Sequence, residues 1–106
     1  MPVVKLDDIA IKELFPGFEA RLIHTDGLTI GYFYIKKGSF LPTHHHIHEQ
    51  VSNVLEGEFE MTIDGITSIL KLGSVAVIPS NTPHGGRAIT DCIILDVFRP
   101  TRDDYK

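Results

Sequence analysis

The segment Glu58-Phe-Glu-Met-Thr-Ile-Asp-Gly-Ile-Thr-Ser-Ile-Leu-Lys-Leu72 carries the clearest structural signal in the chain. Polar and apolar residues alternate in its first half, which places Phe59, Met61 and Ile63 on one face of a strand. Asp64-Gly65 is a two-residue hairpin signal, and a second β-rich run follows it. The pattern therefore predicts an antiparallel hairpin with one face toward a core.

The same pattern extends outward on both sides of this hairpin. Residues 20–25 and 28–36 are β-rich runs separated by Asp26-Gly27, a second hairpin signal. Residues 74–78 and 92–98 are further β-rich runs. We expect about eight to nine short strands in all, and no long helical period interrupts them. The sequence predicts an all-β fold, namely one antiparallel β-barrel of the jelly-roll type whose edges close on themselves.

The length of the chain bounds its organisation. With 106 residues, 42% of them apolar, the chain can bury one core, so we expect a single domain. Within its first part, Asp8 is expected to cap a short helical turn through residues 9–15, which Pro16-Gly17 would stop. The expected parts are an N-terminal lead-in, a barrel and a C-terminal tail, residues 1–18, 19–98 and 99–106.

Charge and composition exclude several classes of partner. Ten basic and 14 acidic residues give a net charge of −4. The chain therefore lacks the excess of basic residues that is typical of proteins that bind nucleic acid or an anionic membrane surface. No apolar run is long enough to span a membrane. The single cysteine, Cys92, excludes an intramolecular disulfide and favours a reducing compartment, so we expect a cytoplasmic protein.

Four of the six histidines lie within residues 44–48. His44 and His46 are two apart, and on a strand this spacing sends both imidazoles to one face. Gln50 and the distant His84 are the natural candidates to complete a coordination sphere around a divalent transition metal ion. Three nitrogens and one oxygen would leave positions open for water or substrate, as in a catalytic site.

Neighbouring residues compete for these roles. Glu49 rivals Gln50 as the oxygen ligand, because a carboxylate binds a divalent metal better than an amide does. His48 would share the ligand face if the strand continued, but we interpret residues 47–49 as a bend between two strands. Alternation points His45 to solvent. An exposed polar loop that binds metal adventitiously is the plainer alternative to a built site.

Two spaced motifs resemble those of the cupin family. The first is Gly38-x5-His44-x-His46-x3-Gln50-x6-Gly57, with glutamine where most cupins have glutamate. The second is Gly73-x5-Pro79-x-Asn81-x2-His84, with asparagine in place of the usual glycine. The resemblance implies a single cupin barrel with Glu49 as a bystander. It also implies one divalent ion, such as nickel, zinc, iron or manganese, on His44, His46, Gln50 and His84.

The glutamine in the first motif has an electrostatic consequence. An amide in place of a carboxylate raises the net charge of the metal site by one unit, which weakens metal binding and makes the ion a stronger Lewis acid toward an anion. A site of this kind suits an anionic small molecule such as a sugar acid. We therefore expect an acidic small-molecule partner despite the negative charge of the whole chain.

The C-terminal segment Asp96-Val-Phe-Arg-Pro-Thr-Arg-Asp-Asp-Tyr105 resembles the tail of the pectin-degradation cupins of the KdgF type. This resemblance implies an enzyme that opens the ring of 4,5-unsaturated monouronates, released from pectin or alginate, to give linear keto acids. It places Asp96, Phe98 and Arg102 around the substrate. Analogy with small cupins also implies a homodimer.

The residues themselves suggest roles for this chemistry. Asp96 and Phe98 have the same parity on the last strand, so both should face the barrel interior. Asp96 would act as the general base and could return the proton later. Phe98 would be an apolar wall against the sugar, with plain barrel core as the alternative. Arg102 would anchor a carboxylate or hold Asp96 ionised, with a purely structural ion pair between them as the alternative. Arg87 would meet an anion at the barrel mouth, unless it is simply a solvated loop arginine.

Two other functions fit the same residues. One is a non-catalytic, metal-containing cupin that binds a sugar acid, and the other is a metal-dependent dioxygenase on the same barrel. Turnover separates the first of these from a uronate-opening enzyme, and oxygen consumption separates the second.

Overall fold

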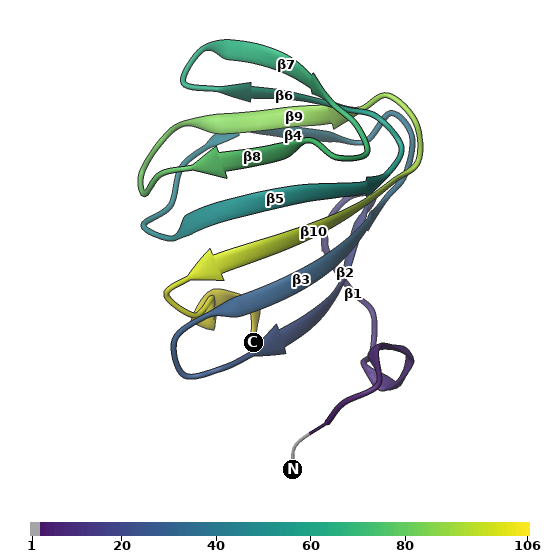
Figure 1. Cartoon of the computed structure of the whole chain (residues 1–106), viewed down its shortest axis with the longest axis vertical. Coiled ribbons are helices and arrows are strands. Elements are labelled where there is room, and N and C mark those ends of the chain that lie inside the picture. The colour runs from purple at the N-terminus through teal and green to yellow at the C-terminus, as the bar shows by residue number, and fades with distance from the viewer. Residues whose placement is uncertain (1–2) are drawn as a thin grey trace.

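The computed structural model describes residues 3–106, which fold into two antiparallel β-sheets around a shared interior (Figure 1). The larger sheet has the order β1-β2-β3-β10-β5-β8, formed by Lys12–Phe15, Phe18–His24, Thr29–Ile35, Cys92–Arg99, Glu49–Glu56 and Val75–Ile78. The smaller sheet has the order β4-β9-β6-β7, formed by Phe40–His44, His84–Ala88, Phe59–Ile63 and Ile66–Leu70. The all-β prediction is confirmed.

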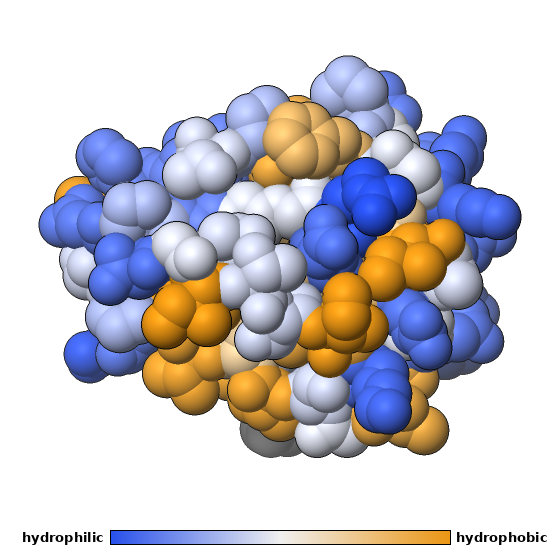
Figure 2. Space-filling view, turned by 90° about the horizontal axis from the view of Figure 1, so that it is seen from above, coloured by the Kyte–Doolittle hydropathy of each residue, from blue (hydrophilic) through white to orange (hydrophobic). Residues whose placement is uncertain are grey.

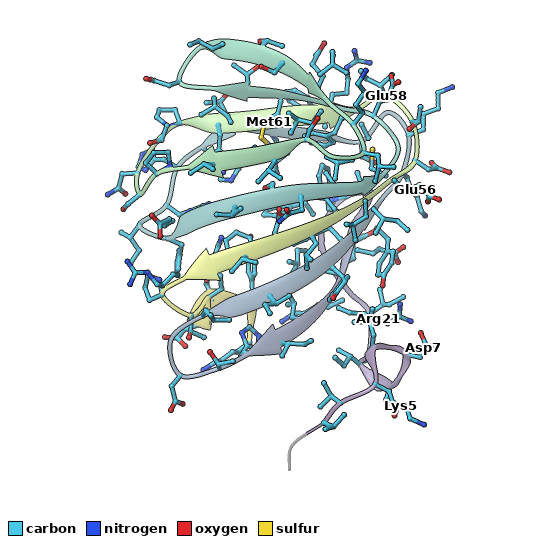
Figure 3. All side chains as sticks on the ribbon, in the orientation of Figure 1. Lys5, Asp7, Arg21, Glu56, Glu58 and Met61 are labelled. Carbon is cyan, nitrogen blue, oxygen red and sulfur yellow. The ribbon has the colours of Figure 1, made fainter. Side chains whose placement is uncertain are left out.

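The central hairpin forms as its sequence predicts. β6 and β7 pair from Phe59 opposite Leu70 to Ile63 opposite Ile66. Asp64-Gly65 makes the turn, with φ angles of 49° and 81°, and this left-handed pair is what a tight hairpin turn requires. Phe59 is buried, and Met61 points between the two sheets (Figure 3).

β10 lies at the centre of the larger sheet, between β3 and β5. Its residues alternate strictly between buried and half-buried, so that Ile94, Asp96 and Phe98 all face the interior. The parity predicted for Asp96 and Phe98 is therefore confirmed. The predicted hairpin around Asp26-Gly27 also forms, as β2 paired with β3.

The N-terminal segment differs from the prediction. Residues 9–15 do not form a helical turn; a single 3₁₀ turn, η1, spans Leu6–Asp8, and residues 12–15 form strand β1. Pro16-Gly17 does not stop a helix but turns β1 into β2, with Phe15 opposite Phe18 and a φ of 82° at Gly17. Arg21 Nε donates to Ile9 O at 3.0 Å and holds this segment to β2 (Figure 3).

The sheets are not closed on themselves, contrary to the prediction. The larger sheet ends at β1 and β8, and the smaller one ends at β4 and β7. Edge strand β7 exposes Ile66 and Ile69, and the view from above shows apolar side chains scattered among polar ones (Figure 2). Within residues 3–106, no helix is long and apolar enough to cross a membrane.

Aromatic side chains fill one end of the interior. The Phe18 ring meets those of Phe15 and Phe59 edge to face, with centroids 6.3 and 6.4 Å apart. Phe33 and Ile94 are buried beside them. This apolar packing holds the two sheets together and leaves the opposite end of the interior to polar side chains.

Candidate metal centre

Two facing strands bring His44 and His84 together. His44 ends β4 and His84 begins β9, and the two residues are direct cross-strand partners whose ring centroids lie 4.4 Å apart. A Cβ on Gly85 would lie 2.7 Å from Leu41 O and 2.9 Å from Thr43 N, so glycine is needed for the strands to approach this closely. The local sequence thus permits the irregular pairing that joins the two imidazoles.

His46 reaches the same point by a different route from the one predicted. β4 ends at His44, so His46 lies in the irregular segment before β5 and not on a shared strand face. Its ring centroid is nevertheless 5.6 Å from that of His44 and 4.9 Å from that of His84. One nitrogen from each of the three rings lies within 4.8 Å of the others.

Backbone carbonyls fix the orientation of all three rings. The Nδ1 atoms of His44, His46 and His84 each lie 2.8–2.9 Å from a carbonyl oxygen, those of Pro42, His48 and Thr82. A carbonyl only accepts, so each Nδ1 carries the proton and each neutral ring keeps its Nε2 lone pair free for a metal. His84 Nε2 is buried and has no hydrogen-bond partner within the described residues.

Burial keeps two of these histidines, His46 and His84, neutral. Burial and the charge of nearby Arg102 lower the pKa of His46 to about 4. Burial is also the main cause that lowers the pKa of His84. Neutral imidazole is the form that binds a metal ion, so these two rings are in the ligand state at neutral pH.

Gln50 supplies the oxygen of the group. It is 7% exposed on β5, its Nε2 donates to Ser52 Oγ at 3.1 Å, and its Oε1 lies 3.1 Å from His46 Nε2. Because His46 carries its proton on Nδ1, that short contact joins two acceptors with no hydrogen between them. A cation shared by both atoms would remove the repulsion. The donor set of three imidazole nitrogens and one amide oxygen therefore fits a divalent metal ion.

The competing residues lie outside this group. Glu49 points away from the interior, is exposed and lies 3.7 Å from Arg99. His48 lies in the predicted bend, and its carbonyl rather than its ring serves the site, by holding His46. His45 is exposed.

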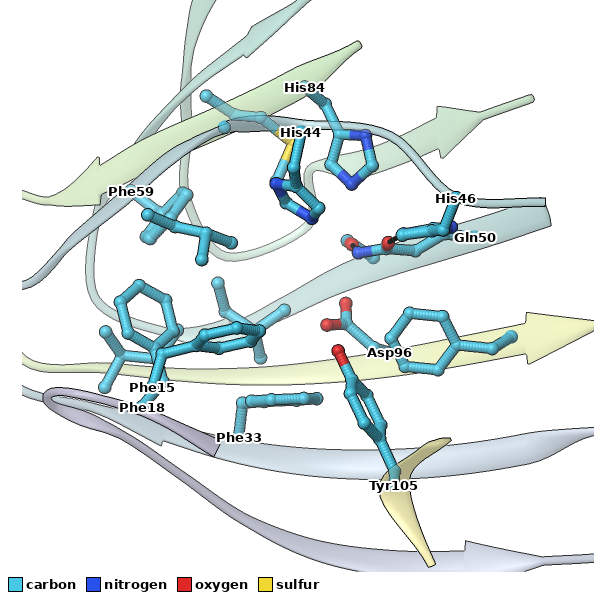
Figure 4. A pocket seen from close by; sticks show the side chains of 17 residues that line it. Phe15, Phe18, Phe33, His44, His46, Gln50, Phe59, His84, Asp96 and Tyr105 are labelled. Carbon is cyan, nitrogen blue, oxygen red and sulfur yellow. Dashed lines mark hydrogen bonds between the residues drawn. The ribbon is translucent and has the colours of Figure 1, made fainter. Parts of the chain in front are cut away.

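Asp96 lies beside the ligands in the cavity (Figure 4). It is 8% exposed, and its Oδ1 finds no hydrogen-bond partner in the described part of the chain. Burial raises the pKa of Asp96 to about 7, although hydrogen bonds from Ser52 and Gln50 and the charge of Arg102 act in the opposite direction. Asp96 is thus a carboxyl group able to accept or release a proton near neutral pH.

Phe98 and Arg102 occupy different places. Phe98 lines the cavity, with its ring centroid 6.1 Å from that of His46. Arg102 is 5% exposed but lies behind the cavity wall, where Nε and Nη2 donate to the Asp104 carboxylate at 3.0 and 2.8 Å. The structural ion pair considered for Arg102 and Asp96 is therefore wrong, because Asp104 takes the guanidinium.

Arg87 does not belong to the cavity in the structure. Its position on β9 points it to the outer face, where its side chain is 51% exposed and lies 3.8 Å from Glu60. The expectation that it meets an anion inside the barrel mouth is not supported by this placement, and the solvated alternative describes it better.

Tyr105 also lines the cavity, although the sequence pattern assigned no role to this end of the tail. Its 3₁₀ turn, η2 (Asp103–Tyr105), carries no periodic signal that assigns a facing direction. Also not predicted was the apolar half of the lining, which is formed by Phe15, Phe18, Phe33, Phe59 and Met61. Alternation along individual strands assigned the inward direction of Phe59 and Met61, but it does not show that they share a cavity with the histidines.

The sheet pair with three inward histidines and a glutamine defines the class of protein. Residues 31–98 match the family model of the cupin domain, and the chain belongs to the cupin family. Over 102 residues it is 31% identical to the pectin degradation protein KdgF of Dickeya dadantii (strain 3937), with 93% of each chain covered.

Solved structures show the same likeness. An RmlC-like cupin from Shewanella frigidimarina superposes with a TM-score of 0.89 at 30% identity, covering 94% of this chain and 91% of that one. KdgF from Halomonas sp. superposes with a TM-score of 0.88 at 29% identity, covering 94% of both chains. The likeness extends over nearly the whole chain.

Proposed function

We propose that this protein is a metal-dependent cupin enzyme that opens the ring of a 4,5-unsaturated uronate and yields a linear keto acid. One observation carries the proposal: a buried carboxyl group, Asp96, lies beside a set of three histidines and one glutamine in a single cavity. The similarity to a protein named for pectin degradation supports the substrate class.

Charge supports an acidic substrate. As metal ligands, three imidazoles and an amide carry no charge, so they would leave the charge of a bound divalent ion uncompensated, with Asp96 as the acidic group of the lining. The ion, when bound, would supply Lewis-acid stabilisation of negative charge on the substrate. The substrate carboxylate would meet a cationic centre inside an acidic protein.

In this proposal Asp96 acts as the general base. Ring opening begins with removal of the proton from the anomeric hydroxyl, and Asp96 Oδ1 is an acceptor without a partner in residues 3–106. As the anomeric carbon becomes an aldehyde, its bond to the ring oxygen breaks and the electron pair stays on that oxygen as an enolate. Protonation at carbon-4 then gives the ketone at carbon-5.

The remaining residues support this reaction from the walls. Phe98 would cover one face of the sugar, as expected for an apolar wall. Arg102 lies behind Phe98, with its guanidinium carbon 4.8 Å from the ring centroid. We therefore assign Arg102 a positioning role, and its positive charge also lowers the pKa of Asp96 against the larger effect of burial.

The test follows the loss of the conjugated double bond by ultraviolet absorbance, with 4,5-unsaturated galacturonate and the metal-loaded protein. We expect acceleration over spontaneous opening, and a loss of about 100-fold or more in Asp96→Asn. Asp7→Asn, on exposed η1, is the matched control and should keep full activity. Wild type that does not exceed the spontaneous rate would overturn the proposal.

Two further measurements separate the alternatives. Oxygen consumption during turnover would favour the dioxygenase. Tight uronate binding by wild type and Asp96→Asn alike, without turnover, would favour a binding protein.

We also propose that the protein acts in the cytoplasm as a homodimer. Val75 and Val77 expose apolar side chains on the outer face of edge strand β8, where a second subunit would cover them. Sedimentation equilibrium tests the oligomeric state, and a monomer at micromolar concentration would contradict the homodimer.

A further inference from the structure

Tyr105 brings a second proton-bearing group to the cavity. The chain leaves β10 and folds back in η2, so that the Tyr105 ring forms part of the cavity lining together with His46, Gln50 and Asp96. Figure 4 shows its hydroxyl directed toward the Asp96 carboxyl group, across from the three histidines.

The ring of Tyr105 is fixed by packing against two side chains, Arg102 and Phe98. The guanidinium carbon of Arg102 lies 3.8 Å from its ring centroid, and the ring of Phe98 meets it edge on at 5.9 Å. The bidentate contact with Asp104 holds that guanidinium in place. The buried arginine therefore serves as a platform for the phenol, which explains why it lies behind the cavity wall.

The tail that carries this phenol is itself anchored. Arg102 N donates to Thr29 Oγ1 at 2.9 Å, and Thr101 Oγ1 donates to Thr25 O at 2.7 Å, at the β2–β3 hairpin. Lys12 Nζ of β1 donates to Tyr105 O at 2.9 Å. A phenol held at its backbone, its ring face and its ring edge is preorganised toward one point in the cavity.

The proposed reaction includes a second proton transfer, and the cavity offers a second group for it. Asp96 takes a proton from oxygen in the first step, and the later step delivers a proton to carbon-4 of the enolate. Burial is the main cause that raises the pKa of Tyr105, so its hydroxyl carries a proton at neutral pH. The phenol and the carboxyl group approach the cavity from different elements, η2 and β10, as two groups acting on different substrate atoms would require.

We propose that Tyr105 is the proton donor to carbon-4 of the enolate; this assignment rests on the proposed function. The enolate double bond supplies the electron pair for the new carbon–hydrogen bond, and the oxygen on carbon-5 becomes the ketone. Tyr105 is left as a phenolate. The proton that Asp96 took from the anomeric hydroxyl then passes to that phenolate, which restores both groups. The sum is an isomerisation that consumes no other reactant.

The stereochemistry of the new methylene group tests this role. In deuterium oxide the wild-type enzyme should place deuterium at one of the two positions on carbon-4, measured by proton NMR at early times. Tyr105→Phe keeps the ring that stacks on Arg102 but lacks the donor. We expect ketone formation to fall about 100-fold, and deuterium to enter both positions equally as released enol ketonises in solution.

Tyr34→Phe is the matched control, because Tyr34 lies on the outer face of β3 and accepts from Arg21 at 3.0 Å. It should keep the wild-type rate and a single labelled position. Tyr105→Phe that retains a single labelled position, at whatever rate, would overturn the donor role, since a structural loss lowers the rate without changing the face of protonation. If wild type does not form the ketone faster than the spontaneous reaction, the proposed function itself is refuted, which is a different outcome from a change in labelling.

Discussion

The two ends of one cavity differ in chemistry although the same strands build both. From the apolar end to the metal-binding end, the inward side chain changes from Ile94 to Asp96 on β10, from Val54 to Gln50 on β5, and from Ala88 to His84 on β9. All of these residues face the interior, so strand alternation does not separate the two ends. Position along the strand assigns a residue to the core or to the site.

The two ends also differ in what they contribute to folding. The aromatic end packs edge to face and buries apolar surface, which stabilises the fold. The other end buries Asp96 Oδ1 and His84 Nε2 without hydrogen-bond partners among the described residues, which costs stability. The comparison predicts that substitutions at one end change stability, while those at the other end change metal and substrate binding.

The largest expected effect is at the aromatic end. Phe59→Ala removes a ring that is 2% exposed and should lower the free energy of unfolding by about 3–5 kcal/mol, measured by urea denaturation. Phe40→Ala is the control, because Phe40 is 61% exposed and should change stability by less than about 0.5 kcal/mol. A comparable loss in both variants would remove the distinction between core and surface.

His84→Ala should produce the reverse pattern. Loss of one ligand should weaken binding of a divalent ion by about 100-fold or more, measured by chelator competition. The stability of the metal-free protein should change by no more than about 1 kcal/mol, because the substitution also removes a buried unpaired nitrogen. His45→Ala, at an exposed neighbour of the ligands, should leave metal binding unchanged.

Local patterns predicted most of the fold. The Asp64-Gly65 turn and the parity of Asp96 and Phe98 depend only on neighbours in sequence, and both are confirmed. β9 was missed because Gly85-Gly86 carries no strand propensity; its position is set by the need for close approach to β4. β1 was taken for a helical turn because Pro16-Gly17 ends a helix and turns a hairpin equally well.

The candidate site divides in the same way. The spacing of the histidines predicted the proposed ligands, although His46 lies in an irregular segment rather than on a strand. The position of Tyr105 and the identity of the ion-pair partner of Arg102 depend on how the C-terminal tail folds back onto β2 and β3. No local sequence pattern predicts this long-range contact. The sequence pattern is therefore most informative for strands and least informative for the tail.

A conservative change at Gln50 should sharpen the contrast between metal-loaded and metal-free protein. Gln50→Glu adds a carboxylate to the metal ligands, so metal affinity should rise about tenfold. The metal-loaded variant should also lose part of its preference for a small molecule that carries a carboxylate over the neutral amide of that molecule. The metal-free variant should be less stable, because a second buried carboxyl group then lies beside Asp96. Titration calorimetry measures the metal affinity and the small-molecule preference, and Glu49→Gln on the exposed face should change neither of these two.

The smallest effect is expected from the tail that supports the metal-binding end. The hydrogen bonds and charge of Arg102 lower the pKa of Asp104, so the unfolded state binds a proton more readily than the folded state. The contribution of Asp104 is thus fully present above the ordinary aspartate pKa of about 3.9 and is lost as the pH falls through the lower folded value.

Asp104→Asn should therefore lower the free energy of unfolding by no more than about 1 kcal/mol at neutral pH, since the Asp104 side chain is 55% exposed. The difference from wild type should vanish in strong acid, as measured by urea denaturation across pH. Asp103→Asn, whose carboxylate is 81% exposed and lies near Lys106, should show a smaller difference. A pH-independent loss in Asp104→Asn would mean that its shape, rather than its charge, holds Arg102 beneath Tyr105.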